Sequence, residues 1–150
     1  MESIHPALVH FPIALLVTAF LFETLALAMR RPAWHRISLW NLGLGTLGAG
    51  VAVLTGRMAE TVAKHSPEIE KVLEQHERLG YLVLGLALAL VGWRLIRRDR
   101  LGPRSRWAVW VLLAALCVLV GTTAHLGGRL VYEFGVGGSY GHRSQIEVVE

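Results

Sequence analysis

The sequence predicts an all-α integral membrane protein built as a four-helix bundle. Hydrophobic residues make up 53% of its 150 residues and the mean hydropathy is +0.47, which is well above ordinary soluble domains. Four apolar stretches are each long enough to cross about 30 Å of hydrocarbon as a helix. They run from Pro6 or Pro12 to Met29, and over Ile37–Thr55, Arg78–Ile96 and Trp107–Leu126. We therefore expect a single four-helix domain over residues 1–150.

The first stretch opens with two histidines and two prolines, His5, Pro6, His10 and Pro12. It lacks the basic leader and the small-residue cleavage site of a signal peptide, so we expect it to be retained as a span. Pro12 cannot donate a backbone hydrogen bond and disfavours a helical residue before it. The helix therefore either begins at Pro12 or begins at Pro6 and is kinked at Pro12.

Small residues follow one stripe of the second stretch: Gly45, Ala49, Ala52 and Gly56. Such a stripe indicates either tight helix packing or room for a flat ligand. In the next connection, about Arg57–Glu77, Ser66 and Pro67 are typical of a helix cap followed by proline at the first helical position. We expect a short amphipathic helix there, lying on the outer surface between spans two and three.

Gly102 and Pro103 break the chain before the fourth span, which contains the single cysteine, Cys117. One cysteine allows neither an intramolecular disulfide nor a CxxC motif, so any metal chemistry has to depend on histidine. After the fourth span the chain is too rich in glycine for a packed element. We expect residues 135–150 to form a flexible outer tail.

Arginines concentrate beside two short connections. Nine of the fifteen basic residues lie there: Arg30, Arg31, Arg36, Arg94, Arg97, Arg98, Arg100, Arg104 and Arg106. The positive-inside rule assigns these connections to the cytoplasm and both termini to the outside. These clusters account for the isoelectric point near 9.8, so we expect the lipid bilayer, and no nucleic acid, as a partner.

Three histidines fall at nearly the same depth near the outer face. At about 1.5 Å per helical residue, His10, His76 and His125 lie about 28, 27 and 27 Å from the inner ends of their spans. Each has a small residue one turn deeper, Ala14, Gly80 and Gly121 respectively. Open space below three imidazoles suits a planar macrocycle such as haem b, whose iron is commonly held by histidine.

Three arginines at the same rim could pair with haem propionates: Arg57, Arg78 and Arg129. His5 lies shallower and is the weaker candidate ligand. Two alternatives stay open. The histidines are structural in a cofactor-free accessory subunit of a larger membrane complex, or they hold zinc or copper, with Glu60 and Glu77 available to complete the ligand shell.

Glu23 lies in hydrocarbon, six residues from the inner end of the first span. Carboxylates inside a membrane are costly, so we expect either a proton-handling role or a structural pair with Arg94, at similar depth on the third span. Five tryptophans at the inner boundary predict an interfacial belt: Trp34, Trp40, Trp93, Trp107 and Trp110.

The motifs HPALVHFPIAL at the start and GGRLVYEFGVG near the end resemble a bacterial family of predicted membrane proteins, domain-of-unknown-function family 2231. His5, His10, His76, His125 and the stretch 127–132 match its pattern. The resemblance implies a four-helix protein of the bacterial cytoplasmic membrane. Some members are joined to Rieske-type or c-type cytochrome domains, which implies electron transfer between quinol or a membrane complex and an outer redox partner. We expect a redox subunit rather than an enzyme on its own.

Overall fold

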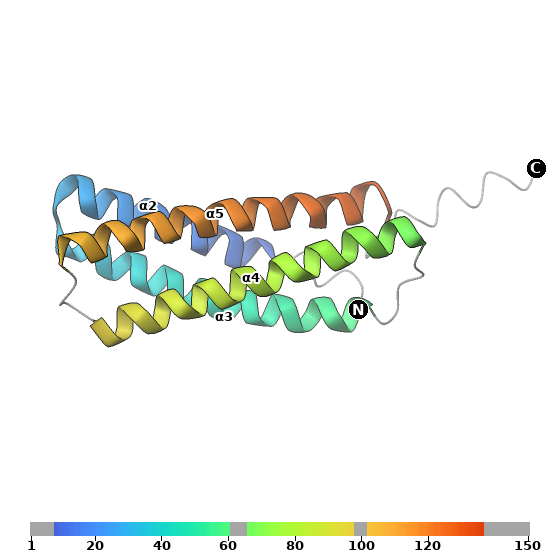
Figure 1. Ribbon diagram of the computed structural model, residues 1–150, viewed down its shortest axis with the longest axis horizontal. Coiled ribbons are helices and arrows are strands. Elements are labelled where there is room, and N and C mark those ends of the chain that lie inside the picture. Colours follow the sequence, from blue (N-terminus) through green and yellow to red (C-terminus); the bar gives the residue numbers. More distant parts are fainter. Residues whose placement is uncertain (1–7, 61–65, 98–101, 137–150) are drawn as a thin grey trace, which may run out of the picture.

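The computed structural model describes residues 8–60, 66–97 and 102–136. These residues form four long helices, α2 His10–Met29, α3 Pro32–Glu60, α4 Pro67–Arg97 and α5 Pro103–Tyr132, and contain no strand (Figure 1). All four are long and apolar enough to cross a membrane. The predicted all-α, four-span architecture is thereby confirmed.

The helices run up and down in chain order. Each packs along the next, and α5 also packs along α2, whereas the backbones of the diagonal pairs in the described chain stay apart and meet through side chains, as Glu23 of α2 and Arg94 of α4 do. Only Arg30 and Arg31 separate α2 from α3, and α4 ends and α5 begins at the same end of the bundle (Figure 1). We call this end, with Arg30, Arg31 and Arg97, the arginine end. The opposite end, which contains His76 and His125, is the histidine end.

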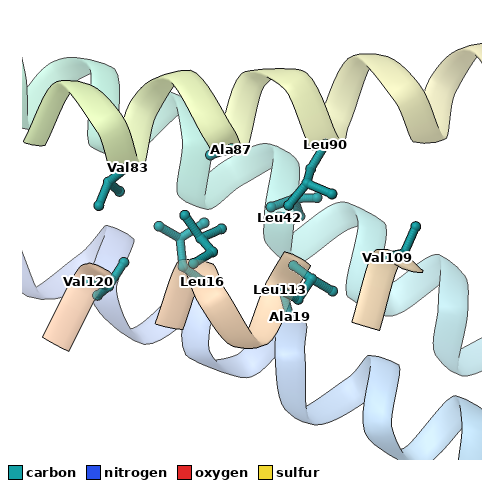
Figure 2. Packing of buried hydrophobic residues seen from close by; sticks show 10 residues of the cluster. Leu16, Ala19, Leu42, Val83, Ala87, Leu90, Val109, Leu113 and Val120 are labelled. Carbon is teal, nitrogen blue, oxygen red and sulfur yellow. The ribbon is translucent and has the colours of Figure 1, made fainter. Parts of the chain in front are cut away.

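Leucines from all four helices fill the bundle axis. Leu16, Leu42, Leu90, Leu113 and Leu116 are essentially inaccessible to solvent. Figure 2 shows several of these side chains meeting between the helices, together with smaller residues of the same cluster. Because the outer surface faces lipid, this packing rather than amphipathicity sets which face of each helix points inward.

Glycines of α3 make room for side chains of α2. A Cβ atom added at Gly45 would lie 2.9 Å from Leu16, and one at Gly48 would lie 3.2 Å from Pro12. The packing interpretation of the stripe in the second span is therefore confirmed at Gly45. Helix α2 begins at His10, so Pro12 stands in its first turn, where no backbone N–H is needed.

Two boundary predictions are wrong. The short outer helix is not a separate element, because α4 is continuous from Pro67 to Arg97 and spans about 46 Å, more than the hydrocarbon thickness. The predicted cap at Ser66 is confirmed, since the Ile69 N–H donates to its Oγ at 3.4 Å. Helix α5 continues through the glycines to Tyr132. Of the predicted tail, residues 137–150 lie outside the described chain.

Candidate functional site

A charge cluster joins three helices near the arginine end. Glu23 of α2 is completely buried; its Oε1 lies 2.8 Å from Nδ1 of His35 on α3, and its Oε2 lies 3.0 Å from Nη1 of Arg94 on α4. The Arg94 side chain is 4% exposed and that of His35 is 15% exposed. The predicted structural pair of Glu23 with Arg94 is confirmed.

The guanidinium of Arg94 is satisfied within the chain. Its Nη1 donates to Oγ of Ser38 at 2.9 Å, and its Nη2 donates to the backbone carbonyl of His35 at 2.7 Å. One carboxylate therefore neutralises one guanidinium in the buried part of the bundle, where an unpaired charge would be costly. The arrangement fastens α2, α3 and α4 to one another.

Sequence reasoning missed His35 and Ser38 as members of this cluster. The sequence does contain a pattern that places Ser38 near Glu23. The two-residue turn makes the hairpin symmetrical: Glu23 lies seven residues before Arg30 and Ser38 lies seven residues after Arg31. Residues placed so lie at the same depth on neighbouring helices, which brings the serine level with the carboxylate.

His76 is held inside the contact between α4 and α5. Its Nδ1 donates to the backbone carbonyl of Thr123 at 3.0 Å, and the ring is half-buried. A Cβ atom added at Gly127 would lie 3.0 Å from the Cε1 atom of this ring, so glycine is what lets the ring approach α5. With Nδ1 as the donor, the ring is fixed in one tautomer and its Nε2 keeps a lone pair.

His10 and His125 are both exposed on the outside of the bundle. The hydrogen bond from Trp110 Nε1 to Thr24 Oγ1, 2.9 Å, sets the register between α5 and α2. His10 lies fourteen residues beyond Thr24 along α2, and His125 lies fifteen residues beyond Trp110 along α5. Counted from this bond at about 1.5 Å per residue, the two histidines lie at similar depths on neighbouring helices.

The structure does not gather the three predicted histidine ligands into one cluster. Within residues 8–60, 66–97 and 102–136, no three histidine, cysteine, aspartate or glutamate side chains form a group that could hold a metal ion. The space predicted beneath the rings is present at two positions, because a Cβ atom added at Gly80 or Gly121 meets nothing within 4 Å. His5 lies outside the described residues.

Two of the three rim arginines already have carboxylate partners. Arg57 Nε lies 3.8 Å from Glu77, and Arg129 Nε lies 2.9 Å from Glu133 on the same helix. Arg78 is exposed and forms no ion pair with the described part of the chain. Of the three, Arg78 is the one whose charge is available to an anionic group from outside the chain.

An apolar groove of about 330 Å³ lies at the outer halves of α2 and α3. Its lining is Leu8, Phe11, Leu44, Leu47, Gly48 and Val51. It contains no polar side chain that could orient a ligand, and none of the candidate histidines lines it. We therefore do not assign the candidate site to this groove.

Residues 1–139 match the family described as "Predicted membrane protein (DUF2231)". The match covers nearly the whole chain and confirms that the chain resembles this family. Neither the curated proteins nor the solved structures contain a match to the chain. The description of the family names no activity, so a function has to be argued from the residues themselves.

Proposed function

Because the chain belongs to this family of membrane proteins, we propose that it is a b-type cytochrome-like electron-transfer subunit, with His10 and His125 holding haem at the histidine end. The observation that carries this proposal is the placement of two exposed imidazoles at one level on neighbouring helices. Histidine is a common axial ligand of haem iron, and bound haem would supply one-electron transfer.

The residues around this pair fit a flat, anionic macrocycle in two respects. Gly121 lies one turn deeper than His125, with nothing within 4 Å of where a Cβ atom would stand. Arg78, at the same end, is exposed and could pair with a propionate. His76 has a different role, because its ring packs against Gly127 and donates to Thr123 inside the α4–α5 contact. It positions α5 rather than ligating iron.

The proposed setting is the cytoplasmic membrane of a bacterium, with the arginine end inside and both termini outside. The basis for this orientation is the excess of lysine and arginine beside the two short connections of the arginine end. The histidine end then faces the outer compartment, where a c-type cytochrome or Rieske partner would exchange electrons with the subunit. Quinol or a larger membrane complex would be the other electron partner.

An absorption spectrum of detergent-purified protein tests this function. Wild-type protein should give a reduced-minus-oxidised haem spectrum, and His10→Ala or His125→Ala should remove most of it, because each variant deletes one ligand. His35→Gln, at the opposite end, is the matched control and should keep the spectrum, because the amide can still donate a hydrogen bond to Glu23. Colourless protein without iron would overturn the haem proposal, and zinc or copper found by elemental analysis would replace it with a histidine-bound metal site.

A cofactor-free accessory subunit is the second candidate function, and glycines on α4 favour it. Added Cβ atoms at Gly85 and Gly92 meet nothing within 4 Å, and these glycines lie opposite the buried residues Val83, Ala87 and Leu90. Small residues on such a face allow another membrane helix to approach closely. Colourless, metal-free protein that co-purifies with a larger membrane assembly would support this candidate.

A further inference from the structure

The described residues at the arginine end present a surface charge of one sign. Six of its arginines are exposed or partly exposed: Arg30, Arg31, Arg36, Arg97, Arg104 and Arg106. None of the six forms an ion pair within the described chain, whereas Arg94 is opposed by Glu23. Among the residues that the structure describes, the acidic residue of this end is Glu23, which is buried against Arg94. We call these six arginines the arginine rim.

Exposed tryptophans accompany two residues of the rim. Trp40 is 72% exposed and follows Arg36 by four residues on α3; Trp107 is 58% exposed and follows Arg104 by three residues on α5. Residues three or four apart share a helix face. Each pair therefore offers a guanidinium at the end of the helix and an indole about one turn deeper, the order in which a phospholipid presents its phosphate and its interfacial region.

The starts of α3 and α5 add to the positive potential of the rim. Both helices begin at this end, and neither has an acidic residue in its first turn. The partial positive charge of a helix N-terminus is therefore not offset by a side chain of that turn. Helix α5 also has no side-chain hydrogen bond at its N-cap, Gly102.

Arg30 occupies a backbone position that suits glycine better. It follows the last residue of α2 with a φ of 51°, in the left-handed region that non-glycine residues adopt only at a cost. Its side chain is exposed and has no ion-pair partner in the described chain. Arginine at this turn therefore contributes charge at the surface and not stability of the turn.

We propose that the arginine rim is a binding surface for anionic phospholipid headgroups. The guanidinium groups bind the phosphate diester, and the exposed indoles of Trp40 and Trp107 lie beside the glycerol and upper acyl region of the same lipids. A membrane lipid is the occupant because both tryptophans continue directly into the apolar, lipid-facing surfaces of α3 and α5. This binding is independent of the haem proposal, which concerns the other end of the bundle.

The tryptophans of the protein are natural reporters for this surface. All five lie in the part of their helices nearest the arginine end: Trp34, Trp40, Trp93, Trp107 and Trp110. In phosphatidylcholine vesicles, bromine-labelled phosphatidylglycerol should quench their fluorescence more than bromine-labelled phosphatidylcholine at the same mole fraction. The double variant Arg36→Gln with Arg104→Gln should lower this preference by up to about fivefold for each arginine, equivalent to about 1 kcal/mol per charge.

A matched control removes two charges from the other end of the molecule. Lys71→Gln on α4 with Arg129→Gln on α5 should leave the quenching preference unchanged, because both residues lie far from the arginine end. Arg30→Gly separates binding from folding: it should reduce the preference without lowering the unfolding temperature. Equal quenching by the two brominated lipids in wild-type protein, or a preference that survives in the Arg36/Arg104 double variant, would overturn the proposal.

Discussion

The carboxylate of Glu23 lies in the spanning part of α2 with none of its side chain exposed, between an imidazole from α3 and a guanidinium from α4. Bringing these groups out of water is costly, and the cost is recovered only while each charged group keeps its partner. Arg94 depends on Glu23 for countercharge, although Ser38 and the His35 carbonyl accept its other hydrogen bonds. Removing the negative charge alone therefore leaves a buried cation.

Glu23→Gln should destabilise the protein by about 3 kcal/mol, because the Arg94 guanidinium then lacks a countercharge inside the bundle. Glu77→Gln is the matched control, since the same substitution there removes a partly exposed ion pair with Arg57 at 3.8 Å. The control should change stability by no more than about 1 kcal/mol. Reversible unfolding in mixed detergent measures both variants.

The double variant Glu23→Met with Arg94→Met extends this prediction. Replacing both charges by apolar side chains leaves no unpaired buried ion, so the double variant should lose less stability than the two single variants added together. Strict additivity, or a Glu23→Gln variant as stable as the Glu77→Gln control, would contradict the assignment of this cluster as the clamp between three helices.

At the scale of helices, the approach of α2 to α3 is controlled by single glycines. Gly45→Ala should destabilise the pair by about 1–3 kcal/mol, because the new Cβ atom would lie 2.9 Å from Leu16 Cδ2 and 3.2 Å from Leu15 Cβ. Gly43→Ala is the control two residues away, where a Cβ atom meets nothing within 4 Å. It should be neutral or slightly stabilising, since alanine favours helix.

Thermal unfolding of the two alanine variants in the same detergent compares them directly. A Gly43→Ala variant that unfolds at a lower temperature than Gly45→Ala would contradict the close approach of α2 to α3. The comparison uses the same substitution on the same helix, so a change in helix propensity alone cannot produce the expected order.

Helix positions were predictable from hydropathy, but helix ends were not. The apolar windows identified all four spans because only a continuous helix satisfies the backbone in hydrocarbon. The polar first turns of α4 and the glycines at the end of α5 lie outside such windows. There the helix is stabilised by contacts between elements, such as the ring of His76 against Gly127, which no local pattern contains.

For the whole molecule, the depth of a residue along the bundle was predictable from the sequence. The direction in which its side chain points around the helix was not. A rise of about 1.5 Å per residue predicts similar depths for His10 and His125, and counting along α2 and α5 from the Trp110–Thr24 hydrogen bond gives the same result. Whether a side chain points into the bundle depends on which helices are neighbours. His76 faces α5, whereas His10 and His125 are exposed, so the predicted ring of three separates into one half-buried and two outer imidazoles. The pairing of Glu23 with Arg94 was predictable because depth and charge both pointed to it.

The orientation of the whole bundle follows from where its charges lie. The arginine rim has no ion pair in the described residues, whereas the described ion pairs that include Arg57 and Arg129 balance charge at the histidine end. Moving the unpaired arginines across the membrane costs more than moving the charge-balanced histidine end. We therefore expect the arginine end to stay in the cytoplasm.

Cysteine labelling tests this orientation. In a Cys117→Ser background, Ser66→Cys and Gly102→Cys place one thiol at each end, both at exposed positions. A membrane-impermeant maleimide should label Ser66→Cys in intact spheroplasts and Gly102→Cys only after permeabilisation. The Cys117→Ser protein without an added thiol controls for background. Labelling of Gly102→Cys in intact spheroplasts would show the opposite topology. His10 and His125 would then lie on the cytoplasmic side, away from any outer redox partner.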